Sequence, residues 1–132
     1  MLELKDFEAA YNKVQEVVLP TKLIKSDYFS DQTGNDVYLK PENMQLTGAY
    51  KIRGAYYKIS TLSEEEKAKG LITASAGNHA QGVALAAARQ GVKATIVMPT
   101  TTPLLKVNRT KDLGAEVILH GDVYDEACAH AL

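Results

Sequence analysis

The chain has 132 residues, of which 45% are hydrophobic and 23% are charged, a composition typical of one globular domain of ordinary size. Its formal net charge of −1 argues against nucleic acid and against an anionic membrane as partners. We expect a cytoplasmic protein, because the single cysteine, Cys128, excludes an internal disulfide, no apolar stretch could span a bilayer, and the first residues lack the order of a signal peptide.

The first forty residues predict one helix and one strand. Apolar residues recur at helical spacing over residues 4–18, and Pro20 ends that pattern. Residues 21–34 are polar and irregular. Residues 36–40 (DVYLK) alternate in polarity and are rich in strand formers, so they predict a strand.

The next segment predicts a loop followed by two helices. The loop covers about ten residues after residue 40, and a helix is expected to begin near Tyr50. Ser63 and Glu66 have the spacing of a capping box, which predicts a further, shorter helix that ends at Gly70.

From residue 70 onward, strands and helices alternate regularly. We expect strands at 71–75, 93–99 and 115–120, each followed by a helix. Residues 76–90 are expected to form a tight turn and then a helix, and the other two helices are expected at 103–113 and 123–132. Thr102 and Asp122 are expected as N-caps of the second and third of these helices, with Pro103 at a first helical position. This order predicts an α/β fold, an open parallel sheet in three layers, preceded by the N-terminal helix and strand.

Two short motifs are candidates for chemistry. In TGAYKIRGA (47–55), Lys51 lies at the expected start of a helix. SAGNHAQG (75–82) follows a strand and opens a helix, so free backbone N–H groups there would attract a carboxylate or a phosphate. Each motif alone also has a plainer interpretation, as a solvated surface lysine and as an ordinary turn.

The sequence contains no motif of the other common cofactor or catalytic sites. The dinucleotide-binding G-x-G-x-x-G, the P-loop and the G-x-S-x-G elbow are all missing. The three histidines and the cysteine do not have the spacing of metal ligands, so no metal site is expected.

Together, KPENMQLTGAYKIRGA (40–55) and TASAGNHAQGVALAA (73–87) resemble the N-terminal part of the threonine dehydratases, also called threonine deaminases or threonine ammonia-lyases. These are pyridoxal 5′-phosphate enzymes of the tryptophan-synthase-β-like fold, fold type II. The resemblance covers nearly the whole chain. It implies β-elimination and deamination of L-threonine, and of L-serine, to 2-oxobutanoate or pyruvate and ammonia.

The resemblance also implies roles for individual residues. Lys51 would form the Schiff base with the cofactor and then act as the catalytic base, Tyr50 would lie near the cofactor ring, and Asn78 would hydrogen-bond the phenolic oxygen of the cofactor. The loop that closes on the substrate carboxylate would consist of Ser75, Ala76, Gly77, Asn78 and His79.

Two residues near Lys51 are not expected to take part in the chemistry. Family members commonly have a serine two residues before the lysine, whereas this chain has Ala49, so no hydrogen bond from that hydroxyl is expected. Arg53 points away from Lys51 on a helix, and we expect it to be structural, paired with a carboxylate.

The resemblance further implies a chain of well over twice this length. Residues 1–40 would pack on a large domain, residues 41–132 would form the small domain that carries both motifs, and the glycine-rich phosphate loop of the large domain would be missing. We expect this fragment to be inactive alone, and the complete enzyme to form a homo-oligomer and to act in amino-acid metabolism such as isoleucine biosynthesis. A catabolic role, a serine dehydratase or serine racemase of the same family, and a non-catalytic α/β binding module remain open as alternatives.

Overall fold

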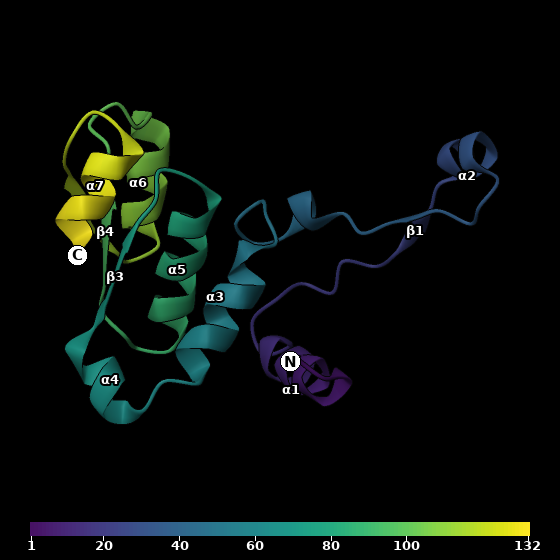
Figure 1. Ribbon diagram of the computed structural model, residues 1–132, viewed down its shortest axis with the longest axis horizontal. Coiled ribbons are helices and arrows are strands. Elements are labelled where there is room, and N and C mark those ends of the chain that lie inside the picture. Colours follow the sequence, from purple (N-terminus) through teal and green to yellow (C-terminus); the bar gives the residue numbers. More distant parts are fainter.

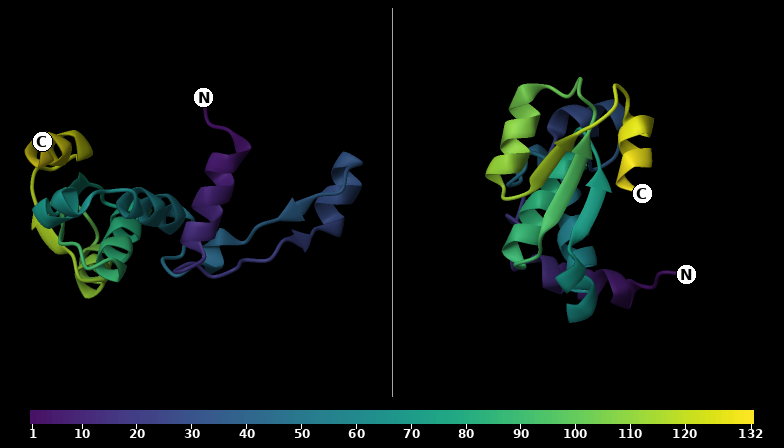
Figure 2. Two further views of the ribbon diagram at one scale, coloured as in Figure 1. Left: turned by 90° about the horizontal axis from the view of Figure 1, so that it is seen from below. Right: turned by 90° about the vertical axis from the view of Figure 1, so that its left-hand side faces the viewer.

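The computed structural model describes residues 1–132 and consists of an α/β unit and an N-terminal arm (Figure 1). The arm extends away from the sheet in two perpendicular views (Figures 1 and 2). Its elements are α1 (Leu4–Val14), β1 (Ile24–Lys25), α2 (Asp27–Thr33), β2 (Tyr38–Leu39) and the short 3₁₀ helix η1 (Glu42–Met44). The α/β unit contains α3 (Lys51–Ser60), α4 (Glu64–Lys69), β3 (Leu71–Ala74), α5 (Asn78–Arg89), β4 (Ala94–Met98), α6 (Leu104–Asp112), β5 (Glu116–Leu119) and α7 (Tyr124–Ala131).

The predicted parallel sheet and the predicted fold class are confirmed. The strand order is β3-β4-β5, both pairings are parallel, and Val97 of β4 is in register with Ala74 of β3 and Ile118 of β5. Helices α5 and α6 pack on one face of the sheet and α7 on the other, as the right-hand view of Figure 2 shows. All three strands end at the same edge, so the loops that follow them are neighbours.

The core lies between the sheet and the pair formed by α3 and α5. Ile52, Ile96 and Met98 are fully buried there. Helix α5 presents mostly alanine to this core, and it approaches α3 closely at Gly82, where an added Cβ would lie 3.1 Å from the carbonyl carbon of Lys51. The small residues of α5 therefore let the backbone of α3 approach it closely.

The arm contains more structure than its sequence predicted. Residues 21–34 were expected to be irregular, but β1 pairs antiparallel with β2, and α2 follows β1. The Ser26 hydroxyl caps α2 by accepting from the N–H of Phe29, and Gly34 ends the helix with φ at 68°. The strand predicted at 36–40 is shorter, at Tyr38–Leu39, and the first helix ends at Val14, after which residues 15–18 form turns.

The capping box of Ser63 and Glu66 is confirmed, whereas two other predicted caps are wrong. Pro103 itself occupies the N-cap of α6 and the Thr102 hydroxyl is buried without a partner. Asp122 precedes the N-cap of α7, and its carboxylate instead accepts a hydrogen bond from Thr100 at 2.9 Å. Both predicted caps were lost because the 99–103 loop packs against the loop after β5. None of the helices is both long and apolar enough to cross a membrane.

Candidate functional site

Lys51 is the first residue of α3, and the loop before it is held from the arm. The side-chain amide of Gln45 accepts from the N–H of Leu19 at 2.8 Å and donates to the carbonyl of the same residue at 3.0 Å. Such a two-point contact between a side chain and a distant backbone fixes the loop without any regular secondary structure. The start of α3 is therefore tied to the segment that follows α1.

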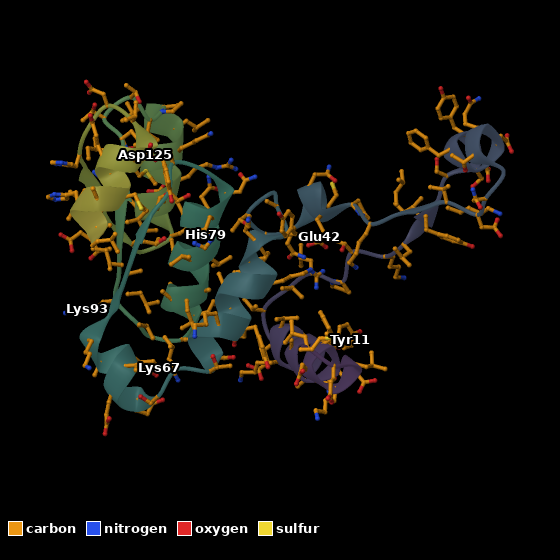
Figure 3. All side chains as sticks on the ribbon, viewed as in Figure 1. Tyr11, Glu42, Lys67, His79, Lys93 and Asp125 are labelled. Carbon is orange, nitrogen blue, oxygen red and sulfur yellow. The ribbon has the colours of Figure 1, made fainter.

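Arg53 lies two residues after Lys51 in α3, and it forms the carboxylate pair that the sequence predicted. Its Nε and Nη2 donate to the two carboxylate oxygens of Glu42, each at 2.8 Å, and Glu42 also accepts from the Thr21 hydroxyl. The Arg53 guanidinium, aided by Thr21, lowers the pKa of Glu42 to about 2, against the effect of burial. Figure 3 shows Glu42 of the arm beside α3, so this pair is a second clamp on the helix that carries Lys51.

The loop of Ser75 to Asn78 begins at the carboxyl end of β3. The Ser75 N–H donates to Val97, and the Ser75 hydroxyl accepts from the N–H groups of Gly77 and Ala80, at 3.3 and 3.2 Å. Ser75 thus acts as the cap of α5 from inside the loop. The N–H groups of Asn78 and His79 have no acceptor within the chain, and they remain free at the positive end of a twelve-residue helix.

The two predicted motifs come together because α3 and α5 begin side by side. The backbone of Lys51 contacts Gly82 of α5, and the Lys51 amine lies 5.2 Å from the centre of the Tyr50 ring. Partial burial, and then the positive charge of Lys51, lower the pKa of His79. Figure 3 shows His79 at the N-terminal end of α5. Lys51, Tyr50 and His79 therefore share one region at the carboxyl edge of the sheet.

Most polar groups of this region form no ion pair or hydrogen bond within the chain. Lys51 takes part in none of the ion pairs of the chain, and the Asn78 side chain is exposed and makes no hydrogen bond. Tyr50 is also exposed, by 59%. An amine, an amide, an aromatic ring and two free N–H groups could together hold a molecule that has a carbonyl, a planar ring and an anionic group.

Cavities add little to this assignment. The largest, about 450 Å³, lies at the opposite edge of the sheet, where Leu71, Ala94 and Glu116 begin their strands. His79 is the single predicted site residue that lines a cavity, one of about 240 Å³ between α3, α5 and β3. We assign the site from the motifs and the helix ends, because no residue that lines the large cavity belongs to either motif.

Sequence reasoning missed two residues that shape this region, Glu42 and Gly82. A glycine inside an alanine-rich helix costs stability, and it signals a packing reason that could have been recognised. The pairing of Glu42 with Arg53, by contrast, spans eleven positions through a loop and leaves no periodic signal.

Known proteins resemble this chain throughout its length. The family model described as "Pyridoxal-phosphate dependent enzyme" matches residues 14–132. An L-threonine ammonia-lyase of Thermotoga maritima is 54% identical over 132 residues, which are 100% of this chain and 33% of that protein. The catabolic L-threonine dehydratase TdcB of Staphylococcus aureus is 54% identical over 127 residues, 96% of this chain and 37% of that protein.

Solved structures agree with these relatives. The processed form of threonine deaminase isoform 2 from Solanum lycopersicum superposes with a TM-score of 0.85 at 43% identity, covering 98% of this chain and 37% of that one. A maize serine racemase gives a TM-score of 0.89 at 32% identity, covering 98% of this chain and 39% of that one. The chain spans about a third of the length of the curated relatives that it matches.

Proposed function

This chain belongs to the family of pyridoxal-phosphate dependent enzymes, and on that premise we propose that it is the lysine-bearing part of a threonine ammonia-lyase. The complete enzyme would convert L-threonine to 2-oxobutanoate and ammonia, and L-serine to pyruvate and ammonia. Residues 41–132 would form its small domain, and residues 1–40 would pack on the remainder of the protein. The exposed apolar residues Phe7 and Tyr11 of α1 support that packing.

The residues of the site suit part of the cofactor. Lys51 offers an amine outside any ion pair, and Tyr50 and Asn78 offer a ring and an amide for its aromatic portion. The close approach at Gly82 holds the start of α3 against α5, which supports a common site for these groups. The chain has nine glycines and no two are adjacent, so the phosphate-binding loop of the family would come from elsewhere in the complete protein.

The cofactor, when bound, supplies an electron sink that makes removal of the substrate Cα proton feasible. Lys51 would hold it, and the Lys51 Nζ would accept the Cα proton. The free N–H groups of Asn78 and His79 would bind the substrate carboxylate with the help of the dipole of α5. Ser75 would keep that loop closed through its hydrogen bonds to Gly77 and Ala80.

One observation supports the proposal most directly: the backbone of Lys51 packs closely against Gly82 of α5, the helix whose free N–H groups would bind an anion. The test is borohydride reduction of the complete protein, followed by peptide mapping. We expect the reduced adduct on Lys51, and loss of activity in Lys51→Ala but not in Lys58→Ala, an exposed lysine of the same helix. An adduct on any other lysine would contradict the assignment.

The assay also separates the alternatives. The likeness to maize serine racemase favours racemisation of serine as a second candidate, so the products of L-serine should be separated on a chiral column. Accumulation of D-serine without pyruvate would favour the racemase. A complete protein that reacts with neither amino acid would be the binding module.

We place the complete enzyme in the cytoplasm, as a homo-oligomer, in amino-acid metabolism. Its product, 2-oxobutanoate, would feed isoleucine biosynthesis. Threonine degradation is the alternative use, and the name of the Staphylococcus aureus relative supports it.

A further inference from the structure

We infer that the stacked imidazoles of His120 and His130 bind a divalent transition-metal ion such as Zn²⁺ or Ni²⁺, at a place separate from the candidate site. His120 directly follows β5, and His130 lies in the last turn of α7. Their ring centres are 3.9 Å apart and their ring planes differ by 13°. Two different elements thus bring two imidazoles face to face.

Both rings are carried by well-anchored backbone. The N–H of His120 donates to the Met98 carbonyl of β4 at 2.9 Å, directly beyond the last pair of the β4–β5 ladder. Helix α7 packs on β3 and β4, and its Ala127, three positions before His130, is fully buried. Because the two imidazoles are already held together, an ion that bridges them costs little conformational entropy.

The ring nitrogens of both histidines are available to a ligand. Both side chains are exposed, and neither takes part in an ion pair or in a side-chain hydrogen bond within the chain. A neutral imidazole has one nitrogen with a free lone pair, and it is the commonest metal ligand in proteins. Two nitrogens at about 2.0–2.1 Å from one ion lie at most about 4 Å apart. Nitrogens of two nearly parallel rings can lie as close together as the ring centres, so a small rotation of one ring suffices for a bridging ion.

The charge of the surrounding segment favours a cation. Residues 115–132 contain no lysine or arginine, and their acidic residues are Glu116, Asp122, Asp125 and Glu126. Figure 3 shows Asp125 on α7, the helix that also carries His130. Charges of one sign attract ions of the opposite sign, so the field around the imidazole pair draws cations and repels anions.

The ligand set selects among cations. Mg²⁺ and Ca²⁺ require oxygen ligands, whereas imidazole suits Zn²⁺, Ni²⁺ and Cu²⁺. No three His, Cys, Asp or Glu side chains of the chain are placed to hold an ion together, so water completes the coordination and the ion exchanges readily. Glu126, one turn before His130 on α7, already accepts from the N–H of Asp122 at 2.7 Å. The sequence gave no sign of this site, because the two histidines lie ten positions apart.

The test counts the Ni²⁺ ions bound per chain of the complete protein by equilibrium dialysis. We expect His120→Asn and His130→Asn each to bind one ion fewer than the unchanged protein, because one imidazole alone holds an ion at least about tenfold more weakly than two together. The double variant should lose no more than either single variant. Cys128→Ser, which removes the free thiol of α7, should keep the ion.

Unfolding then distinguishes a preformed pair from loose binding. An ion that binds the folded chain alone stabilises it by mass action. Ni²⁺ should therefore raise the unfolding temperature of the unchanged protein more than that of either histidine variant.

Four outcomes would overturn the inference. They are equal ion counts in the unchanged protein and both histidine variants, loss of the ion in only one of these variants, loss of the ion in Cys128→Ser, and an equal rise in unfolding temperature in all proteins. None of these measurements uses lyase activity, so the inference stands or fails independently of the proposed function.

Discussion

Replacement of Gly82 by alanine should not stabilise this protein, although alanine is the better helix former. Gly82 lies inside α5, where glycine costs roughly 0.8–1 kcal/mol relative to alanine. A Cβ at this position would lie 3.1 Å from the Lys51 carbonyl carbon, 3.2 Å from the Ile52 nitrogen and 3.2 Å from the Lys51 Cβ. Two of these neighbours are backbone atoms, so α3 and α5 must separate by a few tenths of an ångström.

Gly54 provides a matched control. It also lies inside a helix, α3, but nothing lies within 4 Å of the Cβ that alanine would add there. Gly54→Ala should therefore stabilise the chain by about 1 kcal/mol, the full difference in helix propensity. Gly82→Ala gains the same amount and loses roughly 1–3 kcal/mol to overpacking, so it should be neutral to about 2 kcal/mol less stable than the unchanged chain.

Urea unfolding of both variants, followed by circular dichroism, measures this difference. In the complete protein, Gly82→Ala should also lower kcat by about tenfold, since small displacements of a reacting group reduce rate steeply. Gly54→Ala should leave kcat unchanged. If Gly82→Ala stabilises the chain as much as Gly54→Ala does, the close approach of α5 to Lys51 does not constrain the site.

Three further predictions concern single interactions. Arg53→Met should cost roughly 1–2 kcal/mol at pH 7, less than the full shift in the pKa of Glu42 implies, because the pair is partly solvated. Since that pKa is lowered to about 2, the contribution is complete above about pH 4.5 and is lost as the pH falls toward 2, so urea unfolding curves of the two proteins should converge over that range; a constant difference would contradict the pair. Asn78→Ala in the complete protein should weaken cofactor binding by about 1.5–3 kcal/mol, measured by dialysis and absorbance, and an unchanged affinity would refute its role. Thr102→Val should be neutral or stabilise by up to about 1 kcal/mol, because it removes a hydroxyl without a partner, whereas Thr110→Val should destabilise, because the buried Thr110 hydroxyl donates to the Lys106 carbonyl at 2.9 Å.

The regular part of the fold could be predicted because each element there ends at a local signal. Glycines at 70, 91 and 114 follow a helix, and the strands between them are apolar, so their positions agree with the structure to within a few residues. The elements of the arm could not be predicted in this way. Helix α2 buries no residue, so it has no apolar face to show a period, although Ser26 and Gly34 had the types and spacing of helix caps.

The positions of the candidate site residues at helix starts could be predicted from the sequence, but their arrangement in space could not. The motifs placed Lys51 and Asn78 each at the start of a helix, which follows from local sequence alone. Their proximity depends on how α3 packs against α5, and the residue that sets this distance is Gly82, which carries no chemistry. The clamps on the loop before Lys51 come from Gln45, Glu42 and Arg53, and their partners lie in the arm or across the loop. Such contacts depend on the tertiary fold, since a polar side chain can find a backbone or charged partner at any sequence distance. A mutation in the arm should therefore reach Lys51 through Glu42 and Gln45, although nothing in the arm carries the chemistry.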